Sequence, residues 1–385
     1  MKYVNAKDVL PEEVLSMIRN YYQGGYLYIP KEQDCGIRRQ TDYKIELEKR
    51  NQHIYGKHLE GRTNGQLGRI YHLSESSIRR ILAKERRHYQ KMKESMERIL
   101  HWWGMENGQL RQIYPSAWEL DQAYVIKVYQ DKDQLERNMK ISQILGECGI
   151  PVAKPVLTET GEKYAVYGNN YFLMTEKLQG SMIVNGKDKT IAWEMGRAIA
   201  RLHRAFLKCE REMEFWDNSL LKEMKGWIRD TFIKNEWKIL KEAEYVKTVT
   251  SLEQIYDFLP KQLIHRDVHF GNFLFFEGRL SGYIDFDLSQ RNIRIFDICY
   301  FLTGLLAEET DDAFTETEWM ESVRSVTAGY ESISKLSAQE KEAVPCVMES
   351  IEILFMAYFI SVNDTKQAED ALDVLRFIQN TDLWK

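Results

Sequence analysis

The sequence has little of what marks secreted or membrane-spanning proteins. Its 385 residues include five cysteines, an odd number with neither paired nor metal-like spacing, so neither a disulfide framework nor a cysteine-based metal site is expected. Uncharged apolar runs of about 18 residues, long enough to span a membrane, are missing, and Met1–Asn5 does not lead into an apolar signal segment. We therefore expect reduced thiols and a cytoplasmic protein.

The net charge is also small, at −5, but it is unevenly distributed. Residues 1–100 contain 20 Lys and Arg against 13 Asp and Glu, a net charge of +7, whereas residues 101–385 contain 33 against 45, a net charge of −12. A basic front end suits a polyanion such as DNA. The acidic remainder would attract a cationic substrate or simply keep the protein soluble. The length allows two or three domains, and no internal repeat is visible.

The segment Ile264–Asn272 carries the clearest chemical pattern. It contains His265, Asp267 and Asn272 in H-x-D-x-x-x-x-N spacing, and Asp285 follows 13 residues later at the end of an apolar run. This spacing is typical of the catalytic and metal loops of kinase-like phosphotransferases. Asp267 would accept the proton of a substrate hydroxyl. Asn272 and Asp285 would supply the oxygen ligands that Mg²⁺ prefers.

The surrounding residues predict loops that are supported by strands. Residues 263–264, 273–276 and 280–284 are short apolar runs, and a Glu-Gly turn signal separates the last two. The competing interpretation is that Asp267 and Asn272 merely cap local turns, which is the usual role of either residue alone. The match of several positions in two loops favours catalysis.

This block resembles the aminoglycoside phosphotransferase and choline kinase superfamily, in which the loop commonly reads H-G-D-x-H-x-G-N. Arg266 replaces the usual Gly, a departure that leaves the chemical positions intact. The resemblance extends over roughly residues 103–385 and includes a helix-like segment at 193–203 and a further segment at 294–298.

The resemblance also implies that His265 and Asp297 support the catalytic loop. Taken alone, Asp297 would be an ordinary N-cap for an apolar helix over residues 298–306, and the two roles are compatible.

The expected nucleotide-binding lobe contains a β-rich run at residues 124–129. Lys127 stands in its middle, as expected for the strand lysine that binds nucleotide phosphates, although a lysine in a strand more often just faces solvent. Its usual glutamate partner on the next helix is not evident. Glu136 is nearest in sequence, whereas the spacing of apolar residues favours Asn138 at that position. The sequence leaves open whether any glutamate pairs with Lys127.

A G-x-G-x-x-G motif is missing ahead of Lys127. Ser116 and backbone N–H groups would then contact the phosphates instead. The run at residues 171–178 predicts a strand that connects the two lobes, with Glu176 and Leu178 at the adenine hinge.

Residues 63–82 form a second constellation in the basic portion. Asn64 and Ser74 are suitable N-caps for two helices. The apolar residues fall where two crossed helices would share a core, namely at Leu67, Ile70, Leu73, Ile78 and Ile81. This helix-turn-helix spacing resembles the DNA-binding end of the Mor-type phage activators.

Four polar side chains would point outward from the second helix toward DNA: Ser76, Ser77, Arg79 and Arg80. Hydroxyl and guanidinium groups suit phosphate and guanine contacts in the major groove. The alternative is a helical hairpin with a solvated basic face. The apolar spacing continues from Ile78 to Trp103 without Gly or Pro, so this helix should be nearly continuous with the connection that follows. Residues 5–30 predict a capped helix and a strand that could form a homodimer contact.

These features together predict an α+β protein with a bilobal protein-kinase-like fold, preceded by an all-α helix-turn-helix domain. The expected parts are a DNA-binding-like domain over 1–88, a connecting helix over 89–103, a small lobe over 104–178 and a large lobe over 179–385. We expect Mg²⁺-dependent transfer of phosphoryl from ATP or GTP to a small-molecule hydroxyl. The main alternative is a transcription regulator whose kinase-like domain senses a nucleotide or small ligand without turnover. A third option is a head that binds another protein. The sequence leaves the identity of the acceptor open.

Overall fold

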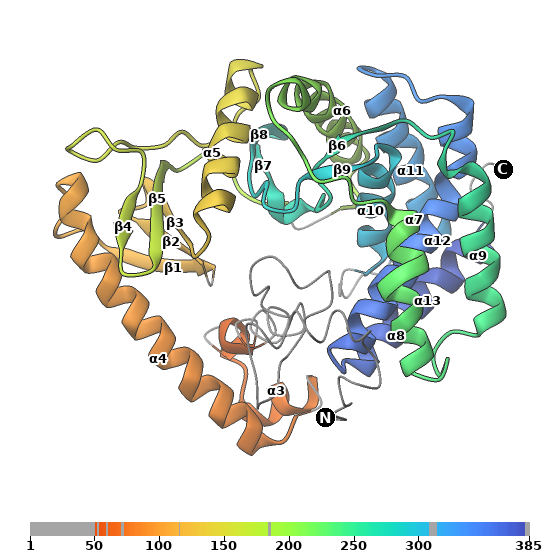
Figure 1. Cartoon of the computed structure of the whole chain (residues 1–385), viewed down its shortest axis with the longest axis horizontal. Helices are drawn as coiled ribbons and strands as arrows, with labels where there is room; N and C mark the ends of the chain where they lie inside the picture. The colour runs from red at the N-terminus through yellow and green to blue at the C-terminus, as the bar shows by residue number, and fades with distance from the viewer. Residues whose placement is uncertain are drawn as a thin grey trace, which may run out of the picture. The chain divides into compact units, whose positions relative to one another are not determined.

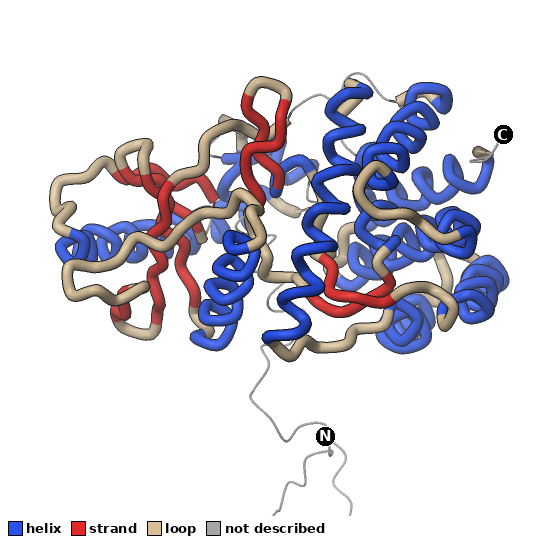
Figure 2. Tube along the Cα trace, turned by 90° about the horizontal axis from the view of Figure 1, so that it is seen from above, coloured by secondary structure: helices blue, strands red, loops and turns tan. Residues whose placement is uncertain are grey.

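The computed structural model describes residues 51, 54–58, 61–70, 73–114, 116–183, 186–307 and 314–381, which all belong to one compact unit spanning residues 47–385. The helix and strand expected within residues 5–30 lie outside the described residues. Figure 1 gives the order of the elements, and Figure 2 shows the sheet of the small lobe apart from the helices of the large lobe.

The small lobe is built on an antiparallel five-stranded sheet with the strand order β1-β2-β3-β5-β4. Its strands are β1 (Leu110–Tyr114), β2 (Ala117–Leu120), β3 (Tyr124–Tyr129), β4 (Ala165–Tyr167) and β5 (Asn170–Glu176). Strand β3 has the bounds expected from its β-branched and aromatic residues. Helix α5 (Lys132–Glu147) follows it after the N-cap Asp131.

Helix α4 (Glu75–Ile99) is continuous over 25 residues, as expected, and runs into a 3₁₀ turn, Leu100–Trp103. Its C-terminal half packs on the sheet of the small lobe, in a buried cluster that includes Met92, Met96, Ile99, Trp103 and Trp118. The ring of Tyr89 stacks on Trp118 with the ring centroids 5.0 Å apart. Helix α4 therefore belongs to the N-terminal region at one end and to the small lobe at the other.

Helix α3 (Asn64–Ile70) and the first turns of α4 form a small core of their own. Its buried residues are Ile54, Tyr55, Leu67, Ile78, Ile81 and Leu82. Ser74 caps α4, as expected. The expected cap of α3 was wrong by one residue: Thr63 Oγ1 accepts from the Gln66 N–H, and the Gln66 side chain accepts from the Thr63 N–H. Asn64 is already helical, so this reciprocal capping falls to Thr63.

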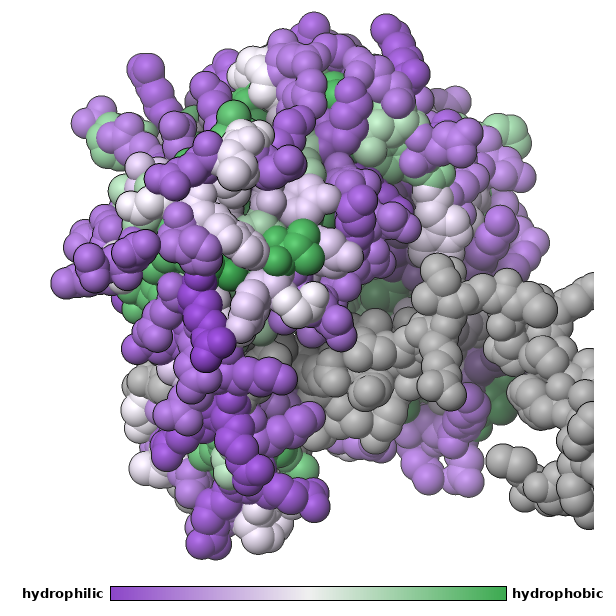
Figure 3. All heavy atoms as spheres, turned by 60° about the vertical axis from the view of Figure 1, so that its left-hand side comes forward, coloured by the Kyte–Doolittle hydropathy of each residue, from purple (hydrophilic) through white to green (hydrophobic). Residues whose placement is uncertain are grey.

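The face that Figure 3 shows, which includes α4 and the small lobe, is mostly hydrophilic, with hydrophobic side chains confined to small patches. The exposed large apolar side chains of the small lobe are Ile113, Tyr114, Leu157 and Val166. Scattered apolar residues of this kind are normal on a protein surface.

The large lobe is mainly helical and contains two antiparallel ribbons, β6–β9 and β7–β8. The strands are β6 (Lys261–Ile264), β7 (Phe273–Phe276), β8 (Arg279–Tyr283) and β9 (Gln290–Ile293). The helices are α6 (Lys189–Glu212), α7 (Leu220–Glu223), α8 (Arg229–Lys234), α9 (Glu242–Tyr256), α10 (Ile295–Ala307), α11 (Glu316–Glu331), α12 (Ala338–Ser361) and α13 (Thr365–Asn380), with a π-helical turn, Met224–Ile228, between α7 and α8.

Strands β6, β7 and β8 confirm the three short apolar strands expected around the catalytic segment. The expected turn between β7 and β8 is also present. Glu277 and Gly278 both have positive φ, 50° and 73°, which is the backbone of a tight hairpin turn.

Helices α6 and α11 cross with their backbones in close contact. A Cβ on Gly196 would collide with the carbonyl oxygen of Val326, and a Cβ on Gly329 would collide with that of Trp193. The missing side chains let the two helices approach.

Helix α12 is, among the described residues, the one helix that is long and apolar enough to cross a membrane. Over half of its most apolar window, 56%, is nevertheless buried inside the protein. Its buried residues belong to the same hydrophobic cluster as those of α6, α10 and α11, so α12 is a core helix of the large lobe.

Candidate active site

The catalytic loop follows β6 and begins with a strained backbone. Arg266 has a φ of 69°, in the left-handed region that favours glycine, which accounts for the Gly in the resembled superfamily. Asp297 supports this conformation, because its carboxylate accepts hydrogen bonds from the backbone N–H groups of His265 and Arg266, each at 2.8 Å. The Arg266 Nη2 also donates to both carboxylate oxygens of Glu223, at 2.8 and 2.9 Å.

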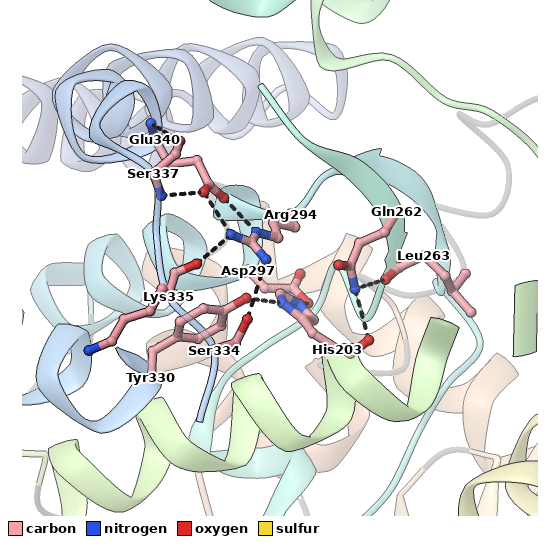
Figure 4. A network of polar contacts seen from close by, with 10 residues as sticks. All are labelled: His203, Gln262, Leu263, Arg294, Asp297, Tyr330, Ser334, Lys335, Ser337 and Glu340. Atoms are coloured by element: carbon pink, nitrogen blue, oxygen red, sulfur yellow. Dashed lines mark hydrogen bonds and ion pairs between the residues drawn. The ribbon is translucent and has the colours of Figure 1, made fainter. Parts of the chain in front are cut away.

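Asp297 is fully buried and stands inside the first turn of α10. The sequence placed it at the N-cap, but α10 begins two residues earlier, at Ile295. Figure 4 shows how it is held: Asp297 Oδ2 lies 3.0 Å from Nε2 of His203 on α6, and His203 Nδ1 lies 2.9 Å from the Tyr330 hydroxyl on α11. The close crossing of α6 and α11 makes the last contact possible.

Arg294 ties the start of α10 to α12 in the same view (Figure 4). Its Nε and Nη2 donate to the buried carboxylate of Glu340, at 2.6 and 2.7 Å, and Nη2 also donates to the Lys335 carbonyl oxygen at 2.8 Å. Three helices therefore fix the residue that holds the catalytic loop.

The carboxylate of Asp267 has a hydrogen-bond donor at each oxygen. Oδ1 accepts from the Tyr300 hydroxyl at 2.9 Å, and Oδ2 accepts from Nδ2 of Asn272 at 3.1 Å. The same Nδ2 donates to the Asp267 carbonyl oxygen at 2.9 Å. His269 Nε2 lies 3.6 Å from Oδ2. Asp267, the expected base, and Asn272, the first expected metal ligand, are thus joined directly.

His265 connects the catalytic loop to the metal loop. It is fully buried, its Nδ1 accepts from the Asp267 N–H at 3.4 Å, and its Nε2 lies 3.3 Å from the Ile284 carbonyl oxygen. The Ile284 N–H in turn donates to the Asn272 carbonyl oxygen at 3.1 Å. These contacts set the position of Asp285 relative to Asn272.

Burial opposes ionisation of Asp267, but its neighbours outweigh that effect. The hydrogen bond and charge of His269, with smaller contributions from His265 and Tyr300, hold the pKa of the carboxyl well below its usual value. Asp267 is therefore ionised at neutral pH. A carboxylate of low pKa is a weak base, which suits a group that orients a hydroxyl and takes its proton late in the reaction.

Lys127 reaches from β3 to the metal loop. Its Nζ donates to Asp285 Oδ1 at 2.8 Å and to Asp287 Oδ2 at 2.7 Å. Burial disfavours the charged amine, but the neighbouring Tyr129, Asp287 and Asp285 raise the pKa of Lys127 above its usual value. Against the effect of burial, Lys127 lowers the pKa of Asp285, whereas burial raises that of Asp287. Asp285 also has positive φ, 62°, so both loops carry a strained residue.

Helix α5 contributes an amide rather than a carboxylate to this cluster. Asn138 is buried and its Nδ2 donates to Asp287. Glu136 instead pairs with Lys132, at 3.1 Å, on the outer side of α5. The spacing that favoured Asn138 was therefore informative.

The remaining residues expected at the nucleotide site lie outside this hydrogen-bonded cluster. Ser116 stands in the β1–β2 turn and accepts from the Val128 N–H at 2.8 Å through its carbonyl oxygen. Glu176 ends β5, and Leu178 packs over Gly282, where a Cβ would lie 2.8 Å from Leu178 Cδ1. Both residues expected at the hinge thus lie where the chain passes from the small lobe to the large lobe.

The donor set fits a hard divalent cation such as Mg²⁺. Asn272 gives its amide nitrogen to Asp267, which leaves the amide oxygen for a ligand, and Asp285 offers a carboxylate. In the described part of the chain, no three His, Cys, Asp or Glu side chains gather to hold a metal by themselves. Mg²⁺ commonly uses one or two protein oxygens together with substrate phosphates and water, so two ligands suffice.

Two residues of the cluster were missed from the sequence, although signals for both were present. Asp287 follows Asp285 by two residues, and both carboxylates accept a hydrogen bond from Lys127 Nζ. Tyr300 follows Asp297 by three residues, which places both on one face of α10.

The four residues expected to contact DNA lie on the first turns of α4. Ser76, Arg79 and Arg80 are exposed, and Ser77 is half-buried. The hydroxyls of Ser76 and Ser77 lie 2.8 and 2.9 Å from Ser74 Oγ, so both serine side chains take part in the helix cap. The two arginines are the charged residues among these four, and Glu75 in the same turn is exposed as well.

Comparison with known families defines the class of protein. A model of the phosphotransferase enzyme family matches residues 112–336, more than half of the chain, and the chain belongs to that family. The protein is a phosphotransferase that acts on a small-molecule hydroxyl, as the catalytic loop predicted. The match begins in β1, so α3 and α4 lie outside it.

Individual relatives are more distant. The chain is 25% identical to homoserine kinase of Rhizobium meliloti (strain 1021) over 248 residues, which cover 60% of this chain and 71% of that protein. Among solved structures it is similar to amicoumacin kinase hAmiN in complex with AMP-PNP, Ca²⁺ and Ami, with a TM-score of 0.56 and 17% identity over 73% of this chain and 92% of that one. It is also similar to the GDP complex of aminoglycoside 2'-phosphotransferase-IIIa, with a TM-score of 0.56 and 14% identity over 75% and 99%. These likenesses confirm the kinase-like α+β fold.

Proposed function

We propose that the protein transfers the terminal phosphoryl group of ATP or GTP to the hydroxyl of a small molecule, with Asp267 as the base. The proposal rests on one observation: Asp267 is hydrogen-bonded to Asn272, and the facing loop brings Asp285 together with Lys127. A proton acceptor, oxygen ligands for a cation and a cation for phosphates are the parts that this reaction requires.

Asn272 and Asp285 are proposed to bind Mg²⁺, which when bound would neutralise charge on the phosphate oxygens. Lys127 and Ser116 would bind the phosphates. Lys127 would then exchange its ion pairs with Asp285 and Asp287 for contacts with phosphate oxygens. This exchange frees Asp285 for the cation.

The base of the nucleotide would lie at the lobe connection, bordered by Glu176 and Leu178. His265 and Asp297 would act indirectly, because their hydrogen bonds hold the backbone on which Asp267 stands. A cytoplasmic location, where ATP and GTP are available, completes this part of the proposal.

The relatives indicate where to look for the acceptor. The curated relatives of this chain include homoserine kinases, and one structural neighbour is an amicoumacin kinase. We propose a small hydroxyl compound that also carries an amine, with homoserine as the first candidate. The net charge of −12 over residues 101–385 supports a cationic or zwitterionic acceptor.

The test is release of ADP or GDP by the purified protein with Mg²⁺ and a panel of homoserine, amino alcohols and aminoglycosides. We expect acceptor-dependent release with one class of acceptor, and loss of that release on removing Mg²⁺ with EDTA. Nucleotide binding without acceptor-dependent turnover would instead support a regulator that senses a nucleotide. One observation favours that alternative, since α5 offers Asn138 rather than a glutamate near Lys127.

The N-terminal region is proposed to bind double-stranded DNA. In this proposal residues 1–88 form the DNA-binding domain, which could pair as a homodimer. Residues 89–103 connect it to lobes over 104–178 and 179–385. Support comes from the exposed Arg79 and Arg80 at the start of α4 and from the net charge of +7 over residues 1–100. Ser76 and Ser77 would contact phosphates from the helix cap.

Binding to random duplex DNA at low and moderate salt tests this proposal. Affinity should fall steeply between about 50 and 200 mM salt, as expected for release of counterions, and Arg79→Ala with Arg80→Ala should weaken it. Salt-independent or undetectable binding would contradict the proposal. The N-terminal region would then be a helical hairpin or a domain that binds another protein.

A further inference from the structure

Tyr300 of α10 has no place in the motifs described above, yet its hydroxyl donates to Oδ1 of Asp267 at 2.9 Å. It stands three residues after Asp297, so both side chains project from the same face of α10. Asp297 binds the backbone of the catalytic loop, and Tyr300 binds the side chain that the loop carries. One face of α10 therefore binds both the backbone of the catalytic loop and the side chain of Asp267.

The ring of Tyr300 is held from two sides. Its centroid lies 5.9 Å from that of Phe296, one turn earlier on α10, and 5.6 Å from that of Phe355 on α12. Burial raises the pKa of the Tyr300 hydroxyl well above its usual value, so the hydroxyl stays protonated and remains a donor. Such a donor can fix its partner without large motion of its own.

The contacts of Asp267 make its two oxygens unequal. Oδ2 accepts from Asn272, which also binds the Asp267 carbonyl oxygen, and lies near His269. Oδ1 accepts from Tyr300. A carboxylate oxygen has a second lone pair, so Oδ1 can still accept a hydrogen bond from an acceptor molecule.

We propose that Tyr300 is a positioning residue for phosphoryl transfer, which fixes the rotation of the Asp267 carboxylate so that Oδ1 faces the acceptor hydroxyl. This inference rests on the proposed function. In the step, the acceptor O–H bond breaks and its proton passes to Oδ1, while the acceptor oxygen bonds to the terminal phosphorus. The bond from that phosphorus to the bridging oxygen breaks, and its electron pair leaves with the nucleoside diphosphate.

Tyr300→Phe removes the hydroxyl and keeps the ring between its aromatic neighbours. We expect kcat to fall by about 10-fold or more, because small misplacements of reacting groups cost this much, while KM for nucleotide and acceptor changes less than about 2-fold. Tyr283→Phe is the matched control. Its buried hydroxyl donates to the Ala198 carbonyl oxygen at 3.0 Å, away from Asp267, and its kcat should match the parent.

A double-mutant cycle separates positioning from mere packing. If Tyr300 acts through Asp267, Tyr300→Phe lowers kcat in the parent but has no further effect on the residual rate of Asp267→Asn. An equal loss in both backgrounds, or no loss in the parent, would overturn the proposal. If the parent phosphorylates no acceptor, the proposed function fails instead. The unfolding free energies of the parent, the two single variants and the double variant then test the contact between Tyr300 and Asp267. Additive effects of the two substitutions on these free energies would overturn it.

Discussion

Asp267 shows how a single carboxylate is set for its task by its neighbours. Two donors fix its orientation and a nearby imidazole keeps it ionised, so it can orient a hydroxyl over a wide range of pH. Arg266, next to it, holds the strained backbone that a glycine would adopt without cost. The arginine is accommodated because Asp297 and Glu223 bind its backbone and side chain.

Asp267→Asn tests the base directly. We expect kcat to fall by at least about 10²-fold, because an amide cannot take the proton, while the nucleotide Kd stays within a few-fold of the parent. Coupled assay of ADP release and calorimetric titration measure the two quantities. Asp373→Asn, at an exposed position on α13, is the control and should leave both unchanged. Turnover close to the parent in Asp267→Asn would remove Asp267 from this role.

Asp285→Ala tests the proposed cation site. Nucleotide affinity is measured with Mg²⁺ and with EDTA, in the parent and in the variant. We expect the parent to bind more tightly with Mg²⁺ and the variant to lose that gain, because a direct ligand is missing. Lys127→Ala distinguishes loss of the cation ligand from loss of the ion pair, since it removes the same salt bridge but keeps Asp285. An undiminished Mg²⁺ effect in Asp285→Ala would place the cation elsewhere.

At the scale of single elements, α12 contains a feature that should make stability depend on pH. Glu352 is buried, and burial raises its pKa to about 8 in spite of a hydrogen bond with Thr303. The unfolded chain releases this proton near the ordinary value of 4.5, whereas the folded protein keeps it. Between these two pH values the unfolded state therefore binds fewer protons than the folded state. The free energy of unfolding should fall as pH rises from about 4.5 to about 8.

Glu352→Gln should remove this dependence. Between pH 6 and pH 8 the parent is expected to lose on the order of 2 kcal/mol of unfolding free energy from this group. The variant should not show this loss. Urea unfolding at the two pH values measures the difference. Glu349→Gln, half-buried on the same helix and bound by Thr248, is the control and should behave as the parent. Equal pH dependence in the parent and Glu352→Gln would contradict the prediction.

Elements defined by a few neighbouring residues were predictable from the sequence. The bounds of β3, the β7–β8 turn and the continuity of α4 follow from local patterns of apolar residues and turn signals. Thr63 was overlooked as a cap because Asn64 offers an equally good side chain one position later. The contact between Asn138 and Asp287 joins residues 149 positions apart, and no local pattern encodes such a distance.

At the scale of the whole molecule, α4 offers a physical route between the N-terminal region and the nucleotide-binding lobe. Tyr89 stacks on Trp118, whose strand β2 pairs with β3 such that Ala117 stands opposite Lys127. A change in the position of Lys127 could therefore be transmitted through β3 and β2 to α4. Coupling of this kind acts in both directions with equal strength.

Nucleotide affinity with and without saturating duplex DNA measures that coupling. We expect DNA to change the nucleotide Kd in the parent, and insertion of Gly-Gly after Gln90 to abolish the change by interrupting α4. The same insertion should leave each Kd alone near its parental value. Identical nucleotide affinity with and without DNA in the parent would leave two independent modules on one chain.

The packing of α4 also bears on how this enzyme could be shortened, or exchanged between proteins by recombination. Met96, Ile99, Leu100 and Trp103 are buried against the small lobe, although they precede the family match at residue 112. Each such side chain contributes about 1.5–3 kcal/mol by its burial, and a typical domain has only about 5–15 kcal/mol in total. A kinase body cut at the start of the family match would therefore lose part of its own core. The folded unit of the small lobe therefore begins ahead of Tyr89, inside α4, whose first turns pack in the N-terminal core.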